Sequence, residues 1–176
     1  MNWLICIAGE VASGKTALAA ALHAALPGSV RLAFGDVVRR RAAAAGLVPT
    51  RRNLQDVGLQ LIAAGWTAFV DELISGLDDG PGDDLDVVVV EGIRHQEAVD
   101  ALRERLRPQQ CLLVYLNITD EQRRQRLAAR VEAESSLRHE VEQHAAALRD
   151  TADLVLSGTQ PADVLVRQVL ERLPNT

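Results

Sequence analysis

The stretch from residue 9 to residue 16 constrains the fold more than any other part of the chain. It fills the pattern G-x-x-x-x-G-K-[ST] with Gly9-Glu10-Val11-Ala12-Ser13-Gly14-Lys15-Thr16. Two glycines at this spacing let the backbone curl so that several N–H groups point inward and can hold the oxygens of a polyphosphate. Lys15 would then reach the outer phosphates, and Thr16 would ligate Mg²⁺. The stretch therefore predicts a phosphate-binding P-loop.

The sequence on either side has the context that such a loop requires. An apolar run of strand length, residues 3–8, precedes it, and strong helix formers follow from Ala17 to Leu26. A bound anion would then lie at a helix N-terminus, where the helix dipole favours negative charge. Lys15 is also the only lysine among 19 lysine and arginine residues. The alternative, a glycine-rich turn that matches by chance, is less favoured by motif and context together.

Composition narrows the class of protein. The 176 residues suit one domain, residues 1–176, that buries roughly 70% of its unfolded surface. A net charge of -5 gives no general attraction to nucleic acid or to an anionic membrane. Cys6 and Cys111 lie in apolar strand candidates, which predicts buried, reduced thiols and a reducing compartment. We find no signal peptide and no apolar run long enough to span a membrane, which predicts a cytoplasmic protein.

Strand and helix signals alternate along the chain. Strands are expected at 3–8, 29–34, 87–90, 111–116 and 154–156, with helices between them. This alternation predicts a three-layer α/β fold of the P-loop NTPase type, with a five-stranded parallel sheet and helices on both faces. Ligands bind beyond the carboxyl ends of strands in such sheets. Gly9, Asp36, Glu91 and Asn117 all fall at such ends, so we expect the site there.

The segment after the second strand has an unusual charge pattern. Asp36 is expected to cap a helix that begins at Val37. Arg39, Arg40 and Arg41 would then lie close to that helix N-terminus, where cations oppose the dipole. A bound anionic ligand nearby would offset this cost.

With these features placed, most of the chain resembles the nucleoside monophosphate kinase branch of P-loop kinases, which includes adenylate kinase and dephospho-CoA kinase. Residues 34–39 look like the segment in which Gly-Asp precedes two apolar residues and an acceptor-binding arginine. Residues 87–94 are similar to the strand that ends in Asp-Gly-x-x-Arg, although Arg94 is one residue closer to its acid, Glu91. Residues 118–130 look like the helix that carries lid arginines, and residues 152–156 resemble the last strand of small kinases related to dephospho-CoA kinase.

The resemblance implies a kinase that uses ATP and Mg²⁺. The acceptor-binding segment would be about 36–77, and a short lid would be about 126–138. The implied catalytic residues are Lys15, Asp36, Arg94 and Arg126. ATP would be held by residues 9–16 together with Ala17, Arg126 and Arg130. The acceptor would contact Asp36, Arg39, Arg51 and Arg94, and the metal would contact Thr16, Asp36 and Glu91.

Several alternatives stay open at this stage. Asp36 is equally consistent with a general base, a metal-shell ligand or a plain helix cap, and the arginines with surface salt bridges. The acceptor is a nucleotide, a nucleoside or a dephospho-CoA-like molecule. A kinase of a nucleic-acid hydroxyl is a second hypothesis, and a non-kinase NTPase or nucleotide-sensing protein is a third. Neither the choice between ATP and GTP nor the oligomeric state follows from the sequence.

Overall fold

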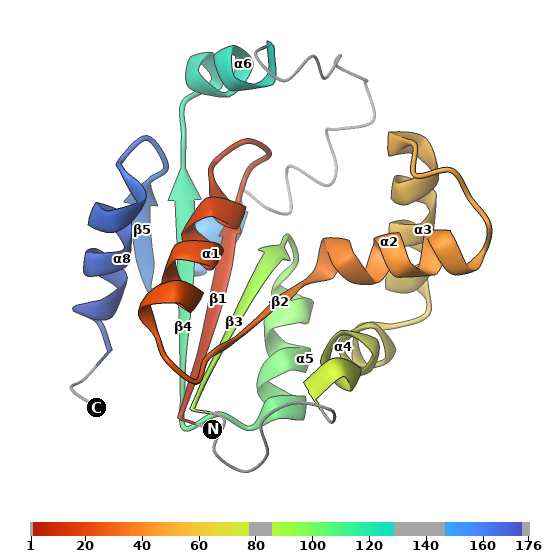
Figure 1. The fold of residues 1–176 in the computed structure, drawn as a ribbon, viewed down its shortest axis with the longest axis horizontal. Helices are drawn as coiled ribbons and strands as arrows, with labels where there is room; N and C mark the ends of the chain where they lie inside the picture. The colour runs from red at the N-terminus through yellow and green to blue at the C-terminus, as the bar shows by residue number, and fades with distance from the viewer. Residues whose placement is uncertain (1, 78–85, 129–146, 174–176) are drawn as a thin grey trace.

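The predicted α/β architecture is confirmed by a computed structural model, which describes residues 2–77, 86–128 and 147–173. Five parallel strands form one sheet in the order β2-β3-β1-β4-β5 (Figure 1). The strands are β1 Trp3–Gly9, β2 Val30–Ala33, β3 Val87–Ile93, β4 Gln110–Asn117 and β5 Leu154–Ser157. β1 lies in the centre, so the loop that follows it leaves from the middle of the sheet's carboxyl edge.

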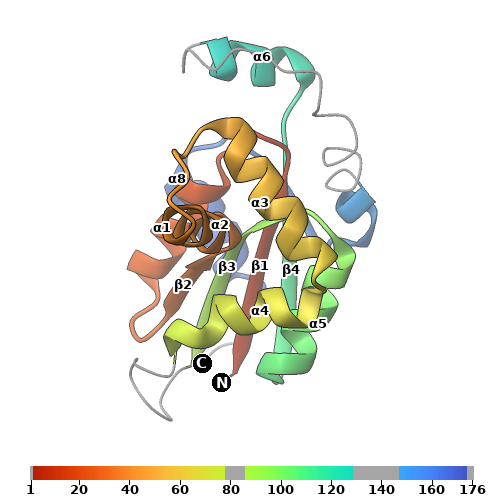
Figure 2. The same cartoon turned by 90° about the vertical axis from the view of Figure 1, so that its right-hand side faces the viewer.

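Helices cover both faces of this sheet, as the two side views show (Figures 1 and 2). They are α1 Lys15–Ala25, α2 Phe34–Ala44, α3 Arg51–Ala63, α4 Trp66–Ile74, α5 Gln96–Leu106, α6 Asp120–Ala128 and α8 Ala162–Leu170, with a 3₁₀ turn at Ser75–Leu77. α1 and α8 pack on one face, while α4 and α5 pack on the other. α2, α3 and α4 extend to one side of the sheet (Figure 1).

The side chains of β1 alternate between the cores on the two faces of the sheet. Ile5 and Ile7 face α1 and α8, whereas Leu4 and Cys6 face α4 and α5, and all four side chains are fully buried. A central strand buried on both faces explains the uninterrupted apolar run. The predicted strand is thus formed, with one further residue, Gly9, at its end.

The helix after β2 begins earlier than the sequence suggested. α2 starts at Phe34, with Ala33 at the N-cap position, so the prediction that Asp36 caps a helix starting at Val37 is wrong. Phe34 is 6% exposed and packs into the α4–α5 core, which favours helix over strand at this residue. Asp36 instead lies in the first turn, where its charge favours the helix dipole.

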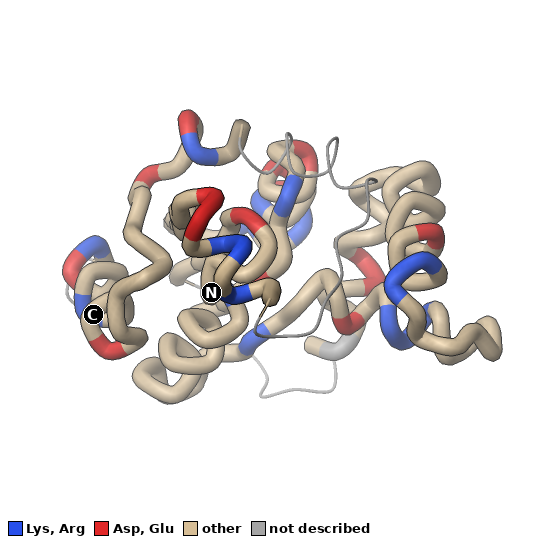
Figure 3. The backbone as a smooth tube through the Cα atoms, turned by 90° about the horizontal axis from the view of Figure 1, so that it is seen from above, with Lys and Arg blue, Asp and Glu red and all other residues tan. Residues whose placement is uncertain are grey.

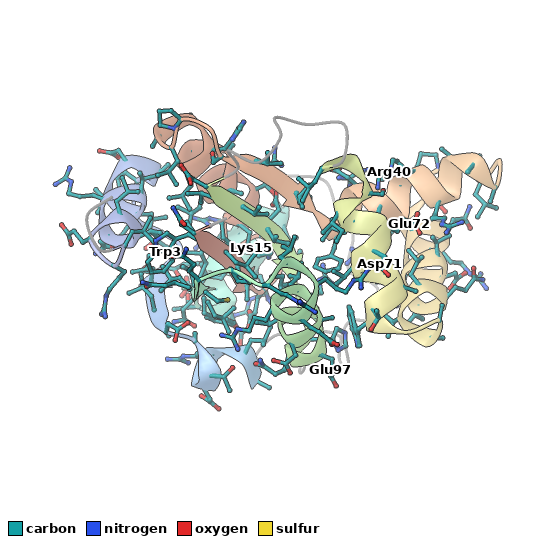
Figure 4. The ribbon with its side chains drawn as sticks, turned by 90° about the horizontal axis from the view of Figure 1, so that it is seen from below. Trp3, Lys15, Arg40, Asp71, Glu72 and Glu97 are labelled. Carbon is teal, nitrogen blue, oxygen red and sulfur yellow. The ribbon has the colours of Figure 1, made fainter. Side chains whose placement is uncertain are left out.

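The arginine run on α2 consequently has a different role from the one expected. The arginines lie in the middle and last turns of α2, so they do not oppose the dipole. Arg41 Nε contacts the carboxylate of Glu72 at 2.8 Å, and Arg40 donates to the Glu72 carbonyl at 3.1 Å. Figure 4 shows Arg40 and Glu72 on the α2–α4 side of the molecule. These two arginines therefore hold α4 against α2.

The two cysteines lie on neighbouring strands away from the P-loop. Cys6 is fully buried, as predicted, whereas Cys111 is only half-buried. The hydrogen bond from the Cys6 thiol, with Arg103 beside it, lowers the pKa of Cys111 to about 7. The same hydrogen bond and burial raise the pKa of Cys6.

The predicted lid involves residues that the structure describes only in part. Residues 129–138 of the expected lid lie outside the described residues, and so does Arg130.

Among the described helices, none alone is long and apolar enough to cross a membrane. The pair α3 and α4 reaches that length and composition together, with a bend of 113° between them.

Candidate functional site

The P-loop has the curled backbone that a phosphate cradle needs. Gly9, Ala12 and Gly14 have φ angles of 141°, 66° and 100°, so the chain turns repeatedly within six residues. At Gly9 a side chain would be blocked, because an added Cβ would stand 2.5 Å from the Leu116 carbonyl oxygen. Backbone that alternates between left-handed and right-handed conformations can form anion-binding concavities of N–H groups.

Lys15 lies folded over this loop. Its Nζ donates to the carbonyl oxygens of Gly9 at 2.9 Å and Glu10 at 2.6 Å, and to Ser13 Oγ at 3.4 Å. The single ammonium group of the chain is therefore held at the loop, and Ser13 is completely buried beneath. Thr16, the second residue of α1, is exposed beside it. Both residues lie at the start of α1, and a helix N-terminus favours an anion.

Arg126 fastens α6 to the P-loop. Its Nη1 donates to the Ala12 carbonyl at 2.9 Å, and its Nη2 donates to the Gly158 carbonyl at 2.8 Å. Gly158 is itself pressed against the loop, because a Cβ there would lie 2.3 Å from the Ser13 carbonyl oxygen. The guanidinium group thus joins the loop after β5 to the P-loop.

A second arginine of α6 reaches the P-loop from the same direction. Arg123 lies 3.8 Å from the Glu10 carboxylate and 3.3 Å from that of Asp120. Thr119 caps the helix, since its Oγ1 accepts from the Gln122 N–H at 3.2 Å. α6 is therefore tied to the P-loop by arginines spaced three residues apart.

Glu91 lies inside β3, paired with an arginine. β3 continues to Ile93, three residues beyond the predicted end, and the Glu91 side chain is only 6% exposed. Arg31 of β2 donates through Nε at 2.9 Å and through Nη2 to Glu91 Oε1. This pairing explains how a carboxylate is tolerated within the strand.

Asp36 and Arg39 stand together at the start of α2. Arg39 Nη2 donates to Asp36 Oδ1 at 2.5 Å, and both side chains are more than half exposed. In the described part of the chain, no three His, Cys, Asp or Glu side chains gather to make a metal site of their own. Hard oxygen donors such as the Thr16 hydroxyl and the Asp36 carboxylate do suit Mg²⁺, which is usually shared with substrate phosphates.

A cavity of about 340 Å³ lies between α2, α3, α4 and the start of α5; we call it the α2–α4 cavity. Val11 of the P-loop contributes to its wall, so the cavity opens beside the nucleotide loop. Three of the four predicted acceptor residues, Arg39, Arg51 and Arg94, line it. Seen from above, α2 and α3 carry several basic segments on this side of the molecule (Figure 3). Arg52, the neighbour of Arg51, does not line the cavity.

Much of the remaining wall is apolar. Phe34 and Phe69 meet edge to face at a centroid distance of 4.9 Å, and Trp66 stacks on Phe69 at 5.9 Å. His95 lies 5.0 Å from Trp66. Sequence reasoning missed these aromatic side chains as site residues. Their rarity was an available signal, because Phe34, Trp66 and Phe69 are three of only five aromatic residues in the chain.

Sequence reasoning also missed Arg31 and Gly158. Nothing local marks Arg31, since its role depends on β2 pairing with β3. The absence of a side chain at Gly158 is explained only once β5 is placed beside the P-loop. The structure therefore gathers Lys15 and Arg126 at the P-loop and Arg39, Arg51 and Arg94 at the adjoining cavity.

Comparisons with known proteins agree with this geometry. A family model described as an AAA domain matches residues 5–147. A search of curated proteins found no match. Among solved structures, the chain is similar to the tunicamycin resistance protein of Deinococcus radiodurans, with 18% identity, a TM-score of 0.66, and coverage of 100% of this chain and 98% of that one.

Two kinases of known acceptors are also similar. Shikimate kinase from Aquifex aeolicus has 16% identity and a TM-score of 0.59, with 96% of this chain and 94% of that one covered. A gluconokinase from Sinorhizobium meliloti has 19% identity and a TM-score of 0.52, with 96% and 89% covered. At these identities the likeness shows the P-loop kinase fold, and it does not single out the nucleoside monophosphate kinase branch.

Proposed function

This chain belongs to the AAA domain family, and we propose that it is a kinase that transfers the γ-phosphoryl group of ATP to a small-molecule acceptor in the α2–α4 cavity. The observation that carries this proposal is the position of Val11. A P-loop residue forms part of the cavity wall, so a triphosphate on the loop would end beside the cavity. Small-molecule kinases among the similar structures support the same activity.

The transfer needs positioning and cations more than covalent chemistry by the protein. An acceptor hydroxyl oxygen forms a bond to the γ-phosphorus while the bond from that phosphorus to the β,γ-bridging oxygen breaks, and ADP leaves with the electron pair. The Asp36 carboxylate takes the hydroxyl proton, as a base at the start of α2. Lys15 and Arg94 neutralise charge on the transferred group.

The hydroxyl oxygen of Thr16 and the carboxylate oxygens of Asp36 and Glu91 are the donor types that Mg²⁺ prefers. Thr16 would hold it directly together with the nucleotide phosphates, and Asp36 and Glu91 would contact it through water. When bound, the ion neutralises phosphate charge. Asp36 cannot serve as sole proton acceptor and direct metal ligand with the same oxygen, and its Oδ1 already binds Arg39. We therefore assign the metal contact to Thr16 and regard the Asp36 contact as water-mediated.

A screen for acceptor-dependent ADP release tests the proposal. The panel contains nucleosides, nucleotides, dephospho-CoA, shikimate, gluconate and DNA ends, each with Mg·ATP. We expect at least one small molecule to stimulate ADP release in the natural protein and not in Lys15→Ala. Turnover of ATP that no acceptor changes would indicate an NTPase instead. Stimulation by DNA ends alone would indicate a nucleic-acid kinase.

A further inference from the structure

Resting on the proposed function, we propose that the acceptor is an amphipathic acid. It carries a phosphate or carboxylate group on an apolar, ring-bearing body, together with the hydroxyl that is phosphorylated. The inference excludes open polyol acids as the preferred acceptors. It follows from the wall of the α2–α4 cavity, which combines an aromatic cluster with arginine side chains.

The aromatic cluster is concentrated at this cavity. The chain has five aromatic residues in all, and Phe34, Trp66 and Phe69 meet at one wall. The rest of the core is built mainly from Val, Leu, Ile and Ala. Phe34 and Phe69 are nearly buried, whereas Trp66 remains half-buried at the cavity. An aromatic wall in an otherwise aliphatic protein offers a ring-bearing ligand edge and face contacts.

The opposite wall is aliphatic. Val38 of α2 and Leu54, Leu59 and Ile62 of α3 line it. Leu59 keeps 49% of its surface exposed, so a ligand in the cavity can cover it. Hydroxyl groups of a polyol would lose water at these walls without gaining hydrogen bonds in return. An apolar body would gain from the same burial.

The charged part of the cavity selects an acid. Three arginines line it: Arg39 of α2, Arg51 in the first turn of α3, and Arg94 in the segment after β3. Guanidinium groups donate pairs of hydrogen bonds that match phosphate and carboxylate oxygens. Arg39 is already oriented by Asp36, which places the acid beside the proposed base. The ligand's anion and its apolar body thus have separate partners.

Binding without ATP tests this inference separately from catalysis. The probes are phenyl phosphate, glycerol 3-phosphate and gluconate, measured by calorimetry or by Trp66 fluorescence in a Trp3→Phe background. Trp3 packs in the core between the sheet and helices α1 and α8. Since the chain has two tryptophans, this background leaves Trp66 as the only one. We expect phenyl phosphate to bind at least about tenfold more tightly than glycerol 3-phosphate, because burying a group of that size contributes a factor on the order of 10–100.

Two pairs of variants separate the apolar and the charged contributions. Leu59→Ser should weaken phenyl phosphate binding several-fold and leave glycerol 3-phosphate unchanged. Its control is Leu47→Ser, since Leu47 is 40% exposed and does not line the cavity. Arg51→Gln should weaken both phosphates about tenfold, as expected for a charge-assisted hydrogen bond. Arg52→Gln, one residue along the same helix, should leave both unchanged.

Mg·ATP binding to the same protein preparation keeps the two proposals distinguishable. If Mg·ATP binds and glycerol 3-phosphate or gluconate binds as tightly as phenyl phosphate, this inference is overturned and the kinase proposal stands. Failure of phenyl phosphate to bind at millimolar concentration has the same consequence. If Mg·ATP does not bind at all, the kinase proposal fails first.

Discussion

Replacing Gly158 by alanine should disturb the P-loop from outside its own sequence. The new Cβ would stand 2.3 Å from the Ser13 carbonyl oxygen and 2.9 Å from Ile118 Cγ2. Both distances are well below an ordinary nonbonded contact, which is about 3.5 Å between carbon atoms. Both neighbours belong to packed segments, so the loop after β5 and the P-loop must move apart. Overpacking of this kind costs about 1–3 kcal/mol.

Thermal unfolding and Mg·ATP calorimetry measure the two consequences. For a protein of this length, the loss corresponds to a fall in Tm of about 2–12 °C. We also expect weaker Mg·ATP binding, because Ser13 is part of the proposed phosphate cradle. Gly58→Ala is the matched control: a Cβ at Gly58 meets only Val38 Cγ2, at 3.9 Å, inside α3. It should stabilise the protein by about 0.5–1 kcal/mol. Equal stability and equal nucleotide affinity of Gly158→Ala and the natural protein would refute the reasoning.

Three further predictions concern single side chains. Asp36→Asn should lower kcat by about 10²–10⁴-fold if Asp36 is the base, and undiminished turnover would remove that role. The free energy of unfolding should change by less than about 1 kcal/mol, because the Asp36 side chain is exposed. Arg31→Met should cost about 1–3 kcal/mol in urea unfolding by leaving the buried Glu91 unpaired, so an unchanged midpoint would contradict it. The rate of Cys111 alkylation should rise with pH around an inflection near 7, because the lowered pKa of Cys111 makes thiolate available there. Cys6, whose pKa is raised, should stay protonated. An inflection above pH 8 would show that the hydrogen bond between the two thiols is not formed.

The sequence was most informative where local pattern and burial agree. The P-loop, the central strand and the alternation of strands with helices follow from motif and periodicity, and they fix the fold class. The start of α2 was misplaced because Phe34 continues an apolar run, and only packing against α4 shows that it begins a helix. The end of β3 was misplaced because Glu91 looks like a strand terminus until Arg31 is placed beside it.

The sequence also predicted part of the candidate site. Lys15 is marked by its motif, and Arg39 and Arg94 by their family resemblance. The aromatic wall was not predictable, because Phe34 and Trp66 are 32 residues apart and meet only through the fold of α2 against α4. Strand order likewise depends on long-range pairing that periodicity does not contain.

Calorimetry of Mg·ATP binding tests the central claim most directly. The account predicts Mg²⁺-dependent binding of a purine triphosphate by the natural protein. Lys15→Ala should weaken it by a factor on the order of 10–100, the value of a charge-assisted hydrogen bond to phosphate. A natural protein that binds neither ATP nor GTP, or a Lys15→Ala variant that binds as tightly, would contradict the account.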